Sequence, residues 1–171
     1  MAELKPLSKE AIPHAQERAE RYRLLNEPLH AESIYLDILS ADPGNHAATI
    51  GLVLSLTDQF RDGTSHGLEH AREQVRNLPS EYEQAYYSGI ICERWGSAQL
   101  AKGVPGYAAV DWFREAMRSY ETAEALSPPD NAEAILRWNA CARIIERTGA
   151  VQPRPAAPGF ESPAQGEMPL E

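Results

Sequence analysis

The residues with the clearest potential for chemistry are two histidines and a glutamate in a short string at residues 66–70. His66 and His70 are four positions apart, and Glu69 lies between them. Because side chains four apart on a helix share one face, both imidazoles could bind a single zinc ion. The carboxylate of Glu69 could then act as the general base that activates a zinc-bound water. This pattern predicts an alternative function for the chain, that of a zinc-dependent hydrolase.

The same string has the form H-x-x-E-H and resembles the metal-binding motif of the inverzincin metalloproteases. Those peptidases also need a third carboxylate ligand and a larger mixed α/β scaffold, and the sequence predicts no such scaffold. A competing interpretation is an exposed helix face, on which His66 lies near the helix start and Glu69 interacts favourably with the helix dipole. We therefore expect no metal, no cofactor and no catalytic residue, and the hydrolase is kept as the alternative.

Two cysteines, Cys92 and Cys141, are the other potential nucleophiles. They lie far apart in the sequence and form no C-x-x-C pair. A nucleophilic cysteine needs a base beside it, and no pattern in the sequence supplies one. No G-x-S-x-G elbow, P-loop or G-x-G-x-x-G string occurs either. Both cysteines are therefore predicted to be buried structural thiols, and the chain is predicted not to be an enzyme.

Seven helices must position these residues, according to the apolar periodicity and the turn signals between the apolar segments. The expected helices span residues 9–25, 29–41, 46–60, 66–77, 80–102, 108–126 and 131–148. Beyond them, residues 150–171 contain five prolines and little periodicity. Such a segment cannot bury enough apolar surface to fold, so we expect a disordered Pro/Gly-rich tail. The remaining residues, 1–149, are expected to form one helical domain.

An internal repeat accompanies the helices. Two groups of residues share the same gaps of four, three and five: Ala116, Tyr120, Ala123 and Pro128, and Ala31, Tyr35, Ile38 and Pro43. A small residue, an aromatic residue, a second small or apolar residue and a closing proline let two helices approach and then turn the chain. Repeats of this kind are typical of stacked helix pairs that bind partners rather than catalyse reactions.

This spacing resembles the second helix of a tetratricopeptide repeat (TPR), and the resemblance extends over residues 12–148. It implies a right-handed α-solenoid of about three TPR helix pairs with a C-terminal capping helix. Relative to the usual unit of about 34 residues, the third pair carries an insertion of about 15 residues near 97–110. The second pair departs most from the pattern, because Ala71 stands where an aromatic residue is usual.

TPR proteins commonly bind peptides on the concave face that their first helices form. The repeat register places five candidate partner-binding residues on that face: Tyr86, Ile90, Arg94, Asn139 and Arg143. One branch of the family clamps a C-terminal carboxylate with lysine and asparagine, but Gln16 and Glu20 occupy the corresponding positions here. The resemblance thus implies a peptide or partner helix bound through apolar anchors and arginines. The same groove could instead bind a second copy of the chain, so self-association stays open.

Charge and hydropathy narrow the classes of partner. The chain has a net charge of -9, whereas nucleic acid and anionic membranes attract basic surfaces. The first residues include no apolar stretch typical of a secretory signal, and no run of about 18 apolar residues could span a membrane. We therefore expect a cytoplasmic protein whose partner is a protein or peptide, not nucleic acid or a membrane.

Overall fold

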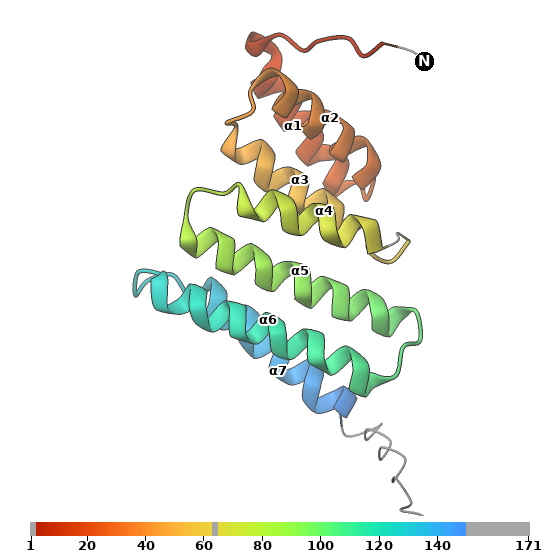
Figure 1. Ribbon diagram of the computed structural model, residues 1–171, viewed down its shortest axis with the longest axis vertical. Helices are drawn as coiled ribbons and strands as arrows, with labels where there is room; N and C mark the ends of the chain where they lie inside the picture. Colours follow the sequence, from red (N-terminus) through yellow and green to blue (C-terminus); the bar gives the residue numbers. More distant parts are fainter. Residues whose placement is uncertain (1–2, 63–64, 150–171) are drawn as a thin grey trace, which may run out of the picture.

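Seven α-helices joined by short turns make up the described part of the chain. The computed structural model describes residues 3–62 and 65–149 (Figure 1). Its helices are α1 (Ile12–Leu24), α2 (Pro28–Ala41), α3 (His46–Asp58), α4 (Ser65–Arg76), α5 (Glu81–Ala101), α6 (Gly106–Leu126) and α7 (Glu133–Gly149). No strand occurs in the two described ranges, so the predicted all-α class is confirmed. Each helix ends within three residues of its predicted bounds, and the predicted tail, 150–171, lies outside the described residues.

Local sequence signals explain where several helices begin. Pro28 is the first residue of α2, a position at which its missing N–H costs nothing. The side chain of Asn45 accepts a hydrogen bond from the backbone N–H of Ala48 and caps α3. At α5, the hydroxyl of Ser80 accepts one from the backbone N–H of Glu83. These caps satisfy N–H groups that the first turn of a helix leaves unpaired.

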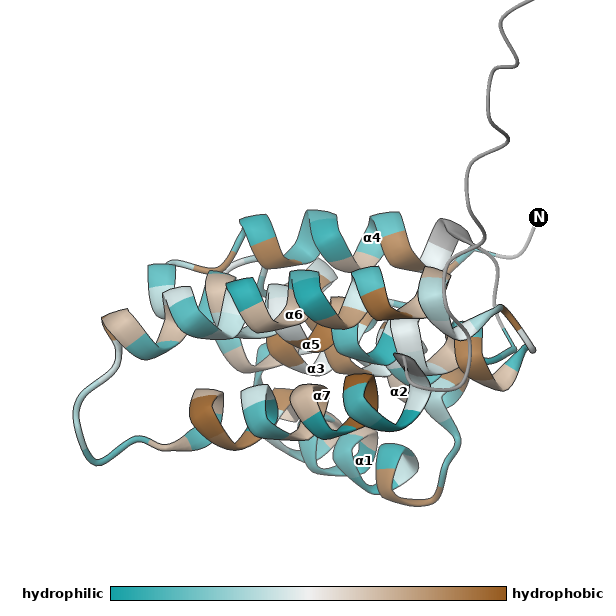
Figure 2. Ribbon diagram, turned by 90° about the horizontal axis from the view of Figure 1, so that it is seen from below, coloured by the Kyte–Doolittle hydropathy of each residue, from teal (hydrophilic) through white to brown (hydrophobic). Residues whose placement is uncertain are grey.

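Helices that are adjacent in the sequence are also adjacent in space. Each helix contacts the next one, and α1 also contacts α3, as α3 contacts α5. In Figure 1, α3, α4, α5 and α6 lie one beneath another, and the loops between them alternate between the two sides of the molecule. Viewed along this stack, α4 and α1 lie on opposite sides (Figure 2). The fold therefore presents two faces, one formed by odd-numbered helices and one on which α4 and α6 lie.

The buried apolar side chains form two clusters. The first extends through α1, α2, α3 and α4 and reaches one side of α5, where it includes Ile91 and Trp95. The second joins other positions on α5 to α6 and α7, and it includes Ile90, Phe113 and Cys141. Because α5 contributes to both clusters, it is the helix that connects the two halves of the stack.

The two repeated tyrosines pack as their spacing predicts. Tyr35 and Tyr120 are fully buried, and each ring lies directly against a glycine of a neighbouring helix, Gly51 and Gly89 respectively. A Cβ atom at either glycine would overlap the tyrosine ring. Only glycine therefore permits this close approach of backbone and ring.

Candidate functional site

The histidine string lies at the start of α4. Glu69 is exposed and accepts a hydrogen bond from Arg72 at 3.2 Å, and His70 is half-buried. The side chain of His66 lies outside the described part of the chain. Within the described part, no three histidine, cysteine or acidic side chains are grouped so that they could hold a metal ion. The hydrolase therefore stays an alternative prediction. Stoichiometric zinc in the purified protein, lost in the His70→Ala variant, would support it.

Cys92 and Cys141 are both buried and unpaired, as the sequence predicts. Burial and the nearby carboxylate of Glu93 raise the pKa of Cys141 to about 12. Burial also raises the pKa of Cys92, against the opposing effect of the Arg72 guanidinium. The thiolate is the reactive form of cysteine, and the raised pKa of each side chain disfavours that form.

On the face formed by the odd-numbered helices, here called the odd-helix face, one carboxylate ties three helices together. Asp58 at the end of α3 accepts a hydrogen bond from Arg23 of α1 at 2.9 Å. Its other oxygen accepts one from Arg94 of α5 at 2.5 Å. Arg94 also donates to the hydroxyl of Thr57 at 2.6 Å. This Asp58 network fixes the relative positions of α1, α3 and α5.

A second carboxylate, that of Glu93 on α5, connects α5 to α6 and α7 by hydrogen bonds. Glu93 accepts hydrogen bonds from Arg137 of α7 at 3.1 Å and from the hydroxyl of Tyr120 of α6 at 2.5 Å. Arg137 also donates to the hydroxyl of Tyr86 at 3.1 Å, and its guanidinium lies 5.8 Å from the centre of that ring. Glu93 and Arg94 are neighbours in α5, so consecutive residues connect this helix to the two ends of the stack.

The five predicted partner-binding residues have different environments. Tyr86 and Asn139 are half-buried, and Arg143 is exposed. Neither the Asn139 nor the Arg143 side chain hydrogen bonds to another described residue, so both are available to a ligand. Ile90, however, is only 2% exposed and belongs to the second apolar cluster, so its surface cannot contact a partner. Arg94 is held within the Asp58 network.

Tyr82, which the sequence argument did not select, completes the accessible part of this face. Its ring stacks on that of Tyr86, with 5.8 Å between the ring centres and 12° between the planes. The hydroxyl of Tyr82 accepts a hydrogen bond from Asn131 at 2.9 Å. Half-buried Leu54 of α3 packs against the second apolar cluster, as Tyr82 and Tyr86 do. The spacing of the two tyrosines, four residues apart on a helix, is the signal that could have identified the pair.

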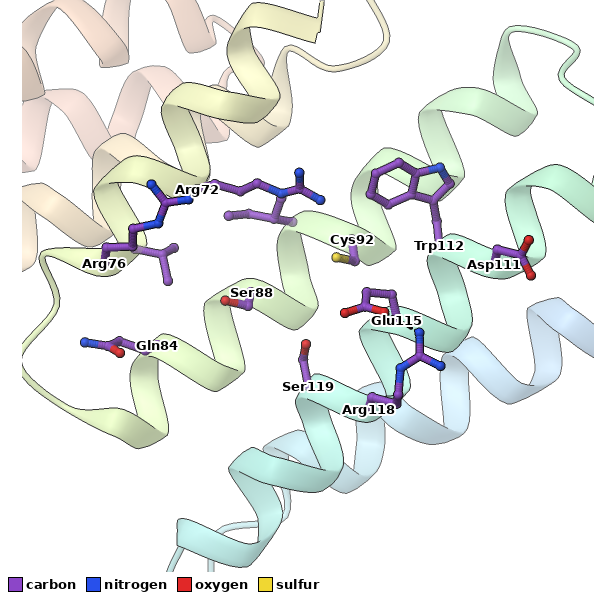
Figure 3. Close-up of a pocket in the computed structure, with 12 residues that line it drawn as sticks. Arg72, Arg76, Gln84, Ser88, Cys92, Asp111, Trp112, Glu115, Arg118 and Ser119 are labelled. Atoms are coloured by element: carbon purple, nitrogen blue, oxygen red, sulfur yellow. Dashed lines mark hydrogen bonds and ion pairs between the residues drawn. The ribbon is translucent and has the colours of Figure 1, made fainter.

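The opposite face of α5 forms the floor of a cleft of about 580 Å³ (Figure 3). Its walls are α4 and α6, and its lining residues are Arg72, Val75, Arg76, Gln84, Ser88, Ile91, Cys92, Asp111, Trp112, Glu115, Arg118 and Ser119. The guanidinium of Arg72 lies 5.5 Å from the centre of the Trp112 ring, so this contact joins α4 to α6 across the cleft. Nothing in the sequence pattern had predicted this cavity.

Comparisons with known proteins do not assign a family to the chain. No protein-family model matches it, and no match was found among curated proteins or among solved structures. Among the described helices, none is both long enough and apolar enough to cross a lipid bilayer. The geometry of the two faces is therefore the basis for assigning a function.

Proposed function

We propose that this chain is a non-enzymatic protein-interaction module that binds a peptide or a helix of a partner protein on its odd-helix face. The observation that carries the proposal is the stacked pair of half-buried tyrosines on α5, Tyr82 and Tyr86. On α7, the side chains of Asn139 and Arg143 make no hydrogen bond with another described residue. Tyrosine and arginine contribute disproportionately to the energetics of protein interfaces.

The arrangement of the tyrosines favours binding because it is rigid before any partner arrives. Hydrogen bonds from Asn131 and Arg137 hold the two tyrosine hydroxyls. The stacking of the rings then fixes the orientation of the apolar surface. A surface that is already ordered loses less conformational entropy on binding than a flexible one. The Asp58 network and the Glu93–Arg137 pair hold the helices around it.

The helical stack supports the same proposal. Helix pairs in series, with Tyr35 and Tyr120 buried at equivalent repeat positions, fit a solenoid of about three TPR-like pairs followed by α7 as a capping helix. In such an assembly the first helices of the pairs, α1, α3, α5 and α7, form a continuous face. A partner segment with an apolar or aromatic anchor for Tyr86 and an acceptor for Arg143 would suit this face.

Affinity capture with immobilised protein tests this function. Tyr86→Ala combined with Arg143→Ala removes one anchor and one unpaired cation from the odd-helix face. Tyr107→Ala combined with Arg114→Ala makes the same chemical change on α6 and is the matched control. The unmodified chain and the control should capture the same partner from native lysate. The odd-helix variant should capture about tenfold less of it, as expected when an interface anchor is lost. Equal capture by all three proteins would exclude this face.

A further inference from the structure

The cleft between α4 and α6 contains hydrogen-bond donors that the protein itself does not use. Arg76 of α4 makes no hydrogen bond or ion pair with another described residue, and its side chain is exposed. The hydroxyls of Ser88 on α5 and Ser119 on α6 likewise have no hydrogen-bond partner among the described residues. Figure 3 shows these side chains on the three helices that enclose the cavity. These unpaired donors belong to three different helices of the cleft.

The two carboxylates that line the cleft, in contrast, are each paired with an arginine of α6. Asp111 accepts a hydrogen bond from Arg114 at 3.1 Å, and Glu115 forms an ion pair with Arg118. Both pairs lie within α6, and the two partners of each pair are one turn of the helix apart. A ligand that enters the cleft therefore meets free donors and no free carboxylate, which favours a ligand rich in hydrogen-bond acceptors.

One wall of the cleft adds a fixed cation and an aromatic surface. Arg72 is held by Glu69 and by its contact with the ring of Trp112, which is half-buried. This pairing leaves N–H groups of the planar guanidinium available, because such a group carries five donors. Three arginines and two carboxylates therefore line this cleft, which leaves it with a small net positive charge in a chain whose net charge is -9. A net positive charge in the cleft of an acidic protein favours an anionic ligand.

We infer that this cleft binds an acidic stretch of a peptide, with a glutamate or aspartate carboxylate held by Arg76, Ser88 and Ser119. The Trp112 ring would then pack against the neighbouring residue of the peptide. The inference does not depend on the proposed odd-helix face, because Ser88 and Tyr86 lie on opposite sides of α5 and belong to separate surfaces.

Fluorescence anisotropy with a labelled peptide of alternating glutamate and glycine tests the inference. The full chain should bind this peptide about tenfold more tightly than the matched glutamine and glycine peptide, because charged acceptors strengthen hydrogen bonds to arginine. Arg76→Glu should weaken binding of the glutamate peptide by about tenfold. Arg21→Glu, which makes the same charge change on exposed α1, is the control and should change binding by less than about twofold.

A second variant predicts a change in the opposite direction. Glu115→Gln removes the carboxylate that pairs with Arg118, so the Arg118 guanidinium becomes available to the peptide. The change also removes from the cleft a negative charge that repels the glutamate peptide. This variant should bind the glutamate peptide about threefold more tightly. A merely structural effect on the cleft would weaken binding instead.

Two results would overturn the inference. The first is equal binding of the glutamate and glutamine peptides, or equal loss in Arg76→Glu and Arg21→Glu. The second is binding only when phosphoserine replaces glutamate in the probe, which would assign the donors to phosphate and not to a carboxylate. Circular dichroism of each variant should match that of the unmodified chain, since Arg76, Arg21 and Glu115 are all exposed.

Discussion

Tyr120 combines an apolar ring with a hydrogen bond to a carboxylate, and both parts are buried in the structure. Its ring lies against Gly89, and its hydroxyl donates to Glu93. Tyr120→Ala should lower the free energy of unfolding by about 3–5 kcal/mol, because it leaves a cavity and removes a donor. Tyr120→Phe keeps the ring and should cost about 1 kcal/mol. Urea unfolding measures both, and a loss below about 1 kcal/mol for the alanine variant would contradict this packing role.

Buried Tyr120 and half-buried Tyr87 also predict how stability depends on pH. Burial and the nearby carboxylate of Glu83 raise the pKa of Tyr87 to about 12, and burial with Glu93 raises that of Tyr120. In the unfolded chain both hydroxyls ionise near pH 10, the ordinary value for tyrosine. The folded state therefore binds more protons above about pH 10. Their contribution is complete below that pH and is lost as pH rises toward the folded pKa values.

Denaturant unfolding between about pH 9 and 12 should thus show a falling free energy of unfolding. Tyr87→Phe should make the fall less steep, because it removes one of the raised groups. A free energy of unfolding that stays constant or increases over this range would show that these hydroxyls ionise as readily in the folded protein as in the unfolded chain.

At the scale of elements, Asp58 determines how three helices sit together. It accepts hydrogen bonds from Arg23 of α1 and Arg94 of α5, and all three side chains are less than one-third exposed. Asp58→Asn leaves two partly buried cations without their counter-ion and should cost about 1–3 kcal/mol. Asp111→Asn, which breaks the exposed pair with Arg114, is the control and should cost less than about 1 kcal/mol. Thermal unfolding of the two variants distinguishes these costs.

Equal costs for Asp58→Asn and Asp111→Asn would mean that the Asp58 network contributes no more than an ordinary surface ion pair. A lower stability of Asp58→Asn without any loosening of α1 against α3 would contradict the role of Asp58 in connecting those helices. Exchange of the backbone amides in α1 provides this second measurement, since loosening of α1 should increase their exchange rate.

The boundaries and the buried tyrosines of these elements could be predicted because their signals are local. Pro43 and Pro128 follow the ends of helices, and the spacing around Tyr120 identifies its buried side without any knowledge of distant residues. The role of Arg94 could not be predicted in this way, because its partner Asp58 is 36 positions away. Repeat register placed Ile90 on the binding face, whereas the packing of α6 and α7 against α5 buries it.

The cleft was missed for a related reason. It depends on the separation of α4 and α6, which are not adjacent in the sequence. At the repeat position where α2 and α6 carry Tyr35 and Tyr120, α4 carries the buried but small Ala71. A small side chain at this position gives α4 less apolar surface with which to pack against the following pair. The sequence shows the small residue at this position, but only the arrangement of three helices shows the cleft, which Arg72, Val75 and Arg76 of α4 line.

At the scale of the whole molecule, α5 connects two apolar clusters that otherwise share few helices. The first is built from α1–α4 and the second from α6 and α7, and α5 contributes different buried residues to each. In helical stacks of this kind, stability is approximately the sum of local terms and contacts between neighbours. The Asp58 network and the Glu93–Arg137 pair cross between helices on either side of α5. A substitution in one cluster should therefore destabilise mainly the helices that form that cluster.

Native-state hydrogen exchange of two core variants tests this division. Phe113→Ala removes a fully buried ring from the second cluster and should reduce the protection of amides in α6 and α7 by about 3–5 kcal/mol. Leu52→Ala removes a buried side chain from the first cluster and should reduce protection in α2 and α3 by about 2–5 kcal/mol. Amides of α5 should respond to both changes, because this helix packs into both clusters. Equal loss of protection across all the described helices in both variants would show instead that the stack opens as one cooperative unit.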